Sequence, residues 1–278
     1  MAQSILYAAA VLAAAVGTNA QDDGAQYLAA RDWRSVTANG PGTKIAVAPN
    51  NGPIIVTEDH GEHWVEVSEI GDWAGVTTSS DFTHLCAWEE SKRVMLRSTD
   101  GGRSWRETAY APDGDFWRFA VYSRDSTQLW ATTQFYHLYY SDDDGASWNR
   151  VTSVPHPADY DFIELSKDGT HILTGGSLLY HTSDYGSTWS RASYGTQGDQ
   201  FHYRKWSDAA VSGTGDKQVA VVYGGALWVS SDGGASWMEH DEVPLLPWAA
   251  VAIDDDGSKM IAVADTGEIW HSTNGGDN

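Results

Sequence analysis

Acidic and aromatic side chains recur together, each set standing just before an apolar run. The sets are Asp32-Trp33, Asp72-Trp73, Asp115-Phe116-Trp117, Asp159-Tyr160-Asp161-Phe162, His202-Tyr203-Arg204-Lys205-Trp206 and Pro247-Trp248. Aromatic faces can stack on sugar rings, and carboxylates accept hydrogen bonds from hydroxyls. We therefore predict a glycan or polysaccharide ligand, bound by Asp32, Trp33, Asp72, Trp73, Trp117, Arg118, Asp159, Tyr160, Trp206 and Trp248. The alternative is structural: the Trp rings pack between sheets, and the Asp residues hold the strand entries.

Catalysis is a second possibility for the same sets. Glycoside hydrolysis needs two carboxyl groups across the scissile bond, and a polysaccharide lyase needs a Tyr or His base beside a cation. The residue types that meet these needs give the catalytic candidates Asp115, Asp161, His156, His202, Tyr203 and Arg204. Residues 202–205 form the dense basic cluster of an acidic chain and could hold a carboxylate or sulfate. Four adjacent residues in a strand-like segment cannot all point one way.

The elements that position these residues follow from a repeated motif, Ser/Thr-x-Asp-x-Gly-x-Ser/Thr-Trp. Its Asp residues are Asp59, Asp100, Asp143, Asp184 and Asp232, and a last copy carries Asn274 instead. The copies are 41 to 48 residues apart, the length of a four-stranded unit. The Asp accepts backbone N–H groups, and the Gly takes a backbone angle that other residues avoid. We expect these Asp residues to be structural and not catalytic.

This motif resembles the Asp-box (BNR) repeat of sialidases, xyloglucanases, sortilin-type receptors and photosystem II assembly factors. The resemblance covers nearly the whole chain after residue 20 and implies a β-propeller. It does not imply one function, because enzymes, receptors and assembly factors share the fold. A sialidase needs three substrate-clamping arginines and an early Phe/Tyr-Arg-Ile-Pro motif. That motif is absent, and Arg34, Arg118 and Arg204 do not form a convincing triad, so we do not expect a sialidase.

The strand pattern predicts an all-β fold, a six-bladed β-propeller of four-stranded antiparallel blades. In the second repeat we expect strands over 73–78, 84–88, 94–98 and 105–108. The last repeat stops inside its box, and the spare segment 26–30 precedes the first repeat. We expect this N-terminal segment to complete the last blade, which removes an open sheet edge. A truncated chain or a seventh, degenerate blade is the alternative.

The motif also selects a face. Because the box connects the third and fourth strands, the connections into each first strand and between the second and third strands lie at the opposite ends. Propeller ligands bind where the inner strands begin. We therefore expect the ligand at the central funnel on the face away from the boxes.

Length, charge and cysteine content restrict the possible partners, the localisation and the disulfide bonds of the protein. The 278 residues carry 38 acids and 17 bases, for a net charge of -21, which argues against nucleic acid as a partner. The apolar run 5–16, followed by Thr18-Asn19-Ala20, predicts a signal peptide over 1–20 and a single secreted domain over 21–278. A retained anchor is the alternative to cleavage. No later segment is apolar enough to span a membrane. Cys86 is the single cysteine, so no internal disulfide is expected.

Sequence motifs for cofactors are missing. No His/Cys/Asp spacing matches a metal site, and no phosphate loop, nucleotide fingerprint or nucleophile elbow occurs. We therefore expect neither a metal nor a cofactor. Three functions remain open: a lectin-like binding protein, a glycoside hydrolase or polysaccharide lyase, and a protein-interaction or assembly propeller.

Overall fold

The computed structural model describes residues 32–89, 91–123, 126, 128–155, 159–194 and 203–276. The expected signal peptide, the segment 26–30, His156 and His202 lie outside these residues. The described chain is all-β, and its one helical element is the single turn η1 (Pro112–Gly114). The all-β prediction is therefore confirmed. In the described part of the chain, no helix is long and apolar enough to cross a membrane.

The chain folds into two compact units. Of the described residues, the N-terminal unit holds those within 32–135 and 140–149, and the C-terminal unit holds those within 136–139 and 150–276. Each is described by itself below.

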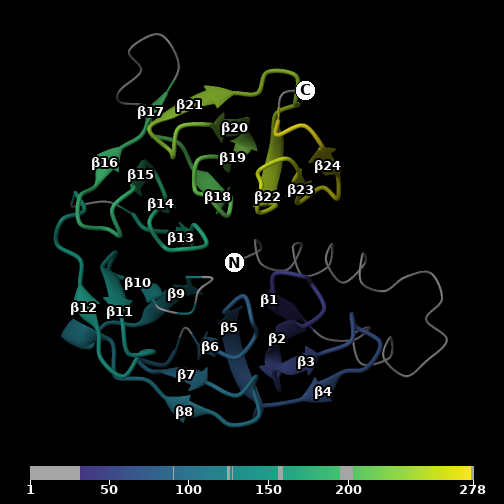
Figure 1. Ribbon diagram of the computed structural model, residues 1–278, viewed down its shortest axis with the longest axis vertical. Helices are drawn as coiled ribbons and strands as arrows, with labels where there is room; N and C mark the ends of the chain where they lie inside the picture. Colours follow the sequence, from purple (N-terminus) through teal and green to yellow (C-terminus); the bar gives the residue numbers. More distant parts are fainter. Residues whose placement is uncertain are drawn as a thin grey trace. The chain divides into compact units, whose positions relative to one another are not determined.

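In the N-terminal unit, the first two repeats form antiparallel groups of four strands in chain order. They are β1 (Trp33–Ala38), β2 (Ile45–Gly52), β3 (Ile55–Thr57) and β4 (Val65–Glu66), then β5 (Gly71–Thr78), β6 (Leu85–Glu89), β7 (Met95–Ser98) and β8 (Arg106–Glu107). The end of β2 also pairs with β5, which joins the two groups into one sheet (Figure 1). The four strands expected in the second repeat are confirmed to within two residues.

The third and fourth repeats each give a separate four-stranded sheet. Their strands are β9 (Trp117–Tyr122), β10 (Leu129–Thr133), β11 (Leu138–Ser141) and β12 (Asn149–Arg150), then β13 (Phe162–Leu165), β14 (Ile172–Gly175), β15 (Leu179–Thr182) and β16 (Ser190–Arg191).

The last two repeats lie in the C-terminal unit. Their strands are β18 (Trp206–Val211), β19 (Gln218–Gly225), β20 (Leu227–Ser230) and β21 (Ser236–Glu239), then β22 (Leu246–Ile253), β23 (Met260–Ala264) and β24 (Ile269–Ser272). The short strand β17 (Ser193–Tyr194) adds to β21 in parallel. Among the described residues, β24 pairs only with β23, and its Ile269 is 58% exposed.

The Asp boxes are self-contained turns, as the motif predicts. In the fifth box, Asp232 accepts hydrogen bonds from Ser230 Oγ at 2.9 Å, Ser236 N at 2.8 Å and Ser236 Oγ at 2.6 Å. The two residues after Asp232, Gly233 and Gly234, have φ of 71° and 89°. Two successive left-handed residues explain why the second position is always Gly.

A second recurring turn lies at the same end of the sheets. It connects the first and second strands, as in Ser166-x-Asp168-x-Thr170, where Ser166 Oγ donates to Asp168 Oδ1 at 2.9 Å. Neighbouring turns of this kind are joined by backbone hydrogen bonds, for example Lys167 N to Gly213 O at 2.9 Å and Gly213 N to Asp255 O at 2.8 Å. The box ends of adjacent repeats are therefore fixed to one another within the C-terminal unit.

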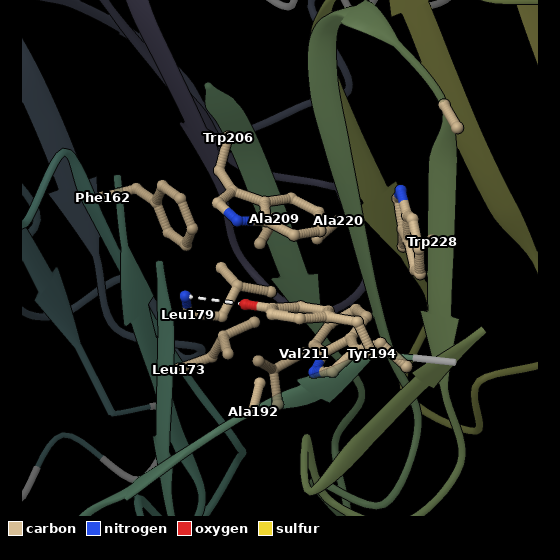
Figure 2. Close-up of a cluster of buried hydrophobic side chains, with 12 residues drawn as sticks. Phe162, Leu173, Leu179, Ala192, Tyr194, Trp206, Ala209, Val211, Ala220 and Trp228 are labelled. Carbon is tan, nitrogen blue, oxygen red and sulfur yellow. Dashed lines mark hydrogen bonds between the residues drawn. The ribbon is translucent and has the colours of Figure 1, made fainter. Parts of the chain in front are cut away.

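Packing between adjacent repeats supplies the core. In the C-terminal unit, Tyr194 stacks on Trp206 with ring centroids 5.8 Å apart, and Trp228 meets both rings edge-on (Figure 2). Figure 2 also shows the Tyr194 hydroxyl accepting a hydrogen bond from Leu179 N, at 3.1 Å. These contacts stabilise the fourth and fifth repeats without a disulfide; the single cysteine, Cys86, is buried and free.

Candidate functional site

The tryptophans of the expected ligand set are buried. The exposed fraction is 8% for Trp33, 4% for Trp73, 0% for Trp117, 2% for Trp206 and 0% for Trp248. Each lies within the first three residues of the first strand of its repeat and packs into the core. A sugar ring cannot stack on these indoles without displacing the surrounding core, so the packing alternative describes what they do in this structure. Tyr160 is also buried, and its hydroxyl donates to Pro155 O at 2.9 Å.

Two of the expected Asp residues hold backbone or side-chain groups at the strand entries. Asp115 is 1% exposed, and it accepts hydrogen bonds from Phe116 N at 2.7 Å and Phe135 N at 3.2 Å. Asp32 accepts one from Asn50 Nδ2 at 3.1 Å. These contacts match the structural alternative, in which the Asp residues hold the strand entries. Asp72 is exposed, and Arg118 is half-buried, its backbone carbonyl accepting the Trp88 Nε1–H at 2.8 Å.

The C-terminal unit does bring several candidates together, around the turn Gly176–Ser177. Ser177 Oγ donates to Asp159 Oδ2 at 3.2 Å, and a Cβ at Gly176 would lie 3.0 Å from Asp161 Oδ2. Arg204 N donates to Ser177 O at 3.1 Å. Asp159, Asp161 and Arg204 therefore lie around one turn, whereas Asp115 belongs to the N-terminal unit.

Arg204 is held by aromatic rings. Its guanidinium carbon lies 4.5 Å from the Trp228 ring centroid and 4.8 Å from that of Tyr194. Such contacts are worth about 0.5–2 kcal/mol, depending on desolvation. The pKa of Tyr194 is raised by burial, although the hydrogen bond from Leu179 and the Arg204 charge oppose the shift. The guanidinium is thus preorganised, and its planar N–H groups suit a carboxylate.

Exposed aromatic and aliphatic side chains stand beside this cation in the chain or on or next to the strands that follow. Tyr203 is 76% exposed, Tyr223 41% and Leu245 67%. Lys205 Nζ lies 4.3 Å from the Tyr223 ring centroid, and Tyr223 N donates to Lys205 O at 2.9 Å. Tyr223 also pairs with Pro247 at the start of β22, two residues after Leu245 in the chain. We call Tyr203, Arg204, Lys205, Tyr223 and Leu245 the basic-aromatic surface.

Leu245 was missing from the residues expected at this face, and Tyr223 was expected there only as part of the connection between the second and third strands of its repeat. Their signal in the sequence is weak: Tyr223 precedes Gly224-Gly225, and Leu245 stands in Pro-Leu-Leu-Pro, both of which are turn contexts. All five residues lie at or next to the strand ends away from the boxes, as expected for a functional face.

One carboxyl group with a strongly shifted pKa was also missed. Asp208, on β18, has its pKa raised to about 7 by burial, although its Oδ2 accepts Val251 N at 2.9 Å. Ser35 fills the same repeat position in the N-terminal unit, and it both accepts from Val76 N and donates to Val76 O, each at 3.2 Å. A protonated Asp208 can donate as Ser35 does, which an ionised one cannot. Its position equivalent to Ser35 identifies it as a link between repeats.

A cluster at a box end offers metal-ligand atoms. In the described part of the chain, Asp59, Glu62 and His63 have such atoms within 4.8 Å of one another. His63 replaces the usual Ser or Thr of the box, and its Nδ1 lies 2.6 Å from Asp59 Oδ2. Since this imidazole makes the contact that the hydroxyl makes elsewhere, the cluster is an ordinary box with a His in it.

Comparisons with known proteins agree with the predicted resemblance. The family model "Photosynthesis system II assembly factor YCF48" matches residues 84–208. The chain is 26% identical over 145 residues to the photosystem II assembly lipoprotein Ycf48 of Synechococcus sp. (strain CC9902), covering 50% of this chain and 43% of that protein. It is 28% identical over 164 residues to a xyloglucanase of Paenibacillus sp, covering 56% of this chain and 14% of that protein. The chain thus spans less than half the length of these curated relatives.

Solved structures share the fold at low sequence identity. YCF48 from Cyanidioschyzon merolae has a TM-score of 0.65 and 14% identity, covering 89% of this chain and 84% of that chain. A structure titled "YCF48 bound to D1 peptide" has a TM-score of 0.63 and 16% identity, covering 89% and 79%. Together with the recurring boxes, these findings confirm the resemblance to Asp-box propellers.

Proposed function

Because the chain belongs to the BNR/Asp-box-like β-propeller superfamily, we propose that it is a protein-binding propeller of the assembly type. Its partner presents an acidic segment to the basic-aromatic surface. The observation that carries this proposal is a pair of ring-bound cations beside the exposed Tyr203. Arg204 lies against Trp228, and Lys205 lies over the exposed Tyr223. Tyr and Arg are the side chains that most often dominate protein interfaces.

Charge supports the same partner. With a net charge of -21, most of the surface repels an acidic polypeptide, and the local cations define where one can approach. This arrangement favours binding at one site, since an acidic segment bound elsewhere on the surface would meet charges of its own sign. The likeness to YCF48, one structure of which is titled as bound to a D1 peptide, points to the same class of ligand.

The proposal includes the architecture expected from the sequence. We propose six blades in one domain over 21–278, with segment 26–30 pairing with β24, and export directed by residues 1–20. The exposed Ile269 and Trp270 of β24 support a further strand at that edge. Deleting residues 26–30 is expected to lower Tm by several degrees, because the open edge loses a strand's packing; an unchanged Tm would contradict the closure.

The binding test uses the full chain and a fluorescein-labelled D1 peptide in a polarisation titration. Lys205→Glu is expected to weaken binding about tenfold, because it reverses a charge at the contact. Lys167→Glu is the matched control, since this exposed lysine of the same unit lies at the box ends. Binding should also weaken with added salt. Equal affinities for the wild type and Lys205→Glu would contradict the proposal.

A carbohydrate ligand is the second candidate, because the chain resembles part of a xyloglucanase. Asp159 and Asp161, which lie together around Gly176, are the carboxylates that could contact a sugar. Titration with xyloglucan oligosaccharides tests this directly. Binding that Asp161→Asn abolishes, without any binding of the D1 peptide, would favour the carbohydrate function over the protein-binding one.

A further inference from the structure

Three connections of the N-terminal unit are tied together at the strand ends away from the boxes. They are the turn with Lys92 and Arg93 between β6 and β7, the segment before β9 with η1, and the turn after β10. Ala111 N donates to Arg93 O, and Gln134 N donates to Phe116 O, both at 2.9 Å. The buried Asp115 fixes two of them further, because its carboxylate accepts from Phe116 N and Phe135 N. Three turns that belong to two repeats therefore form one preorganised surface.

The side chains on this surface combine a cation with exposed rings. The Arg93 guanidinium carbon lies 5.0 Å from the Phe116 ring centroid, and Arg93 itself is exposed. Tyr110 is 69% exposed and Phe135 66%. We call Arg93, Tyr110, Phe116 and Phe135 the Arg93 surface. Phe116 stands in one of the acidic and aromatic sequence sets, whereas Arg93, Tyr110 and Phe135 were not among the residues expected to bind or react.

The chemistry of a ligand follows from this combination. A guanidinium that stacks on a ring keeps its in-plane N–H groups available for the two oxygens of a carboxylate. Exposed Tyr and Phe rings offer apolar contact area with little loss of conformational entropy. The neighbouring Lys92 is neutralised by Glu89, Nζ to Oε1 being 2.6 Å, which leaves Arg93 as the main cation of this turn.

We propose that the Arg93 surface is a second binding site, which takes a polypeptide segment with a carboxylate beside an aromatic side chain. This inference rests on the proposed protein-binding function and adds a separate site on the other unit. Charge complementarity identifies the partner: an acidic segment is repelled by most of a chain with a net charge of -21 and attracted at Arg93. Nucleic acid meets the same repulsion, and it carries one negative charge per phosphate along its whole length.

The test measures binding of labelled poly(Glu,Tyr) and poly(Glu) to the full chain by fluorescence anisotropy. We expect poly(Glu,Tyr) to bind more tightly than poly(Glu), because only the first supplies rings. Arg93→Glu is expected to weaken binding of poly(Glu,Tyr) about tenfold, the size of a single interface anchor. The combined Tyr110→Ala and Phe135→Ala variant is expected to lose the preference for poly(Glu,Tyr) over poly(Glu). Arg106→Glu, on the exposed strand β8 of the same unit, is the matched control and should bind like the wild type.

The outcomes separate this inference from the proposed function. Loss of affinity in Lys205→Glu but not in Arg93→Glu would overturn the Arg93 surface and leave the proposed function standing. Loss in Arg93→Glu and not in Arg106→Glu supports the second site whatever Lys205→Glu does. Equal binding of the two polymers overturns the aromatic part of the inference. Melting curves of each variant verify folding. Arg93→Lys keeps the positive charge but loses the paired N–H donors of the guanidinium, so it should bind with intermediate affinity.

Discussion

The two ends of the strands have opposite characters. At the box ends, the same hydrogen bonds recur from repeat to repeat: the box Asp accepts a hydroxyl two residues before it and a backbone N–H four residues after it, as Asp100, Asp143 and Asp184 all do. At the other ends, a buried Trp recurs, but the exposed side chains differ from repeat to repeat, and cations stack on aromatic rings. A turn that satisfies its own polar groups has little left for a ligand, whereas the variable ends expose rings and charges. Repetition here marks structure, and departure from it marks candidate function.

The largest expected effect on stability is at the strand ends away from the boxes, where a substitution can remove a buried ring. Trp206→Ala should lower the free energy of unfolding by about 3–5 kcal/mol, because it leaves a cavity among large side chains. Urea unfolding followed by tryptophan fluorescence measures this. A variant as stable as the wild type would mean that Trp206 is not a core residue, and would restore it as a ligand contact.

At the box end, Asp232→Ala should lower the free energy of unfolding by about 1–2 kcal/mol, because three donors lose their acceptor at a turn that water can partly reach. Binding of the D1 peptide should stay unchanged after correction for the folded fraction. The measurement is urea unfolding alongside the polarisation titration. A large loss of affinity in the folded variant would show that the boxes take part in binding.

Acid pH should act on the box ends. Hydrogen bonds from the Thr182 and Thr188 hydroxyls hold the pKa of Asp184 down to about 2. A carboxyl with a depressed folded-state pKa stabilises the fold above its unfolded pKa near 4, and this contribution is lost as the pH falls to about 2. Tm should therefore decrease between pH 4 and pH 2, less so in Asp184→Asn. Parallel Tm curves for the two proteins would contradict this.

Asp208 should show the opposite pH dependence. Its pKa is raised to about 7, so its contribution to stability is full below pH 4 and is lost as the pH rises through 7. Asp208→Asn stays neutral, and its amide oxygen can still accept Val251 N. The Tm of this variant should therefore increase relative to that of the wild type as the pH is raised from 4 to 8. A constant difference across this range would mean that Asp208 titrates normally.

The smallest stability effect is expected at the exposed ring of the basic-aromatic surface. Tyr203→Ala should change the free energy of unfolding by less than about 0.5 kcal/mol, as for other exposed positions. It should nevertheless weaken binding of the D1 peptide. Calorimetric melting and polarisation measure the two effects, and a drop in stability without loss of affinity would assign Tyr203 to packing.

The sequence by itself determined the strands, the box turns and the family resemblance. These depend on local chemistry: a period of two along each strand, an Asp that accepts nearby N–H groups, and a Gly in a left-handed turn. The expected strands of the second repeat match the structure closely for this reason. The choice of the face away from the boxes also followed from strand direction alone, and both proposed surfaces lie at that end of the strands.

Only the tertiary structure decided which residues there meet the solvent. Tyr203 and Trp206 belong to the same sequence set at the start of β18, yet Trp206 is 2% exposed and Tyr203 76%. Exposure depends on what the neighbouring repeat packs against the ring, and no local pattern records that. The same holds for Arg204, whose partners Tyr194 and Trp228 come from other strands, and for Arg93, whose partner Phe116 belongs to the next repeat. Binding surfaces built across repeats become visible only when the repeats are packed together.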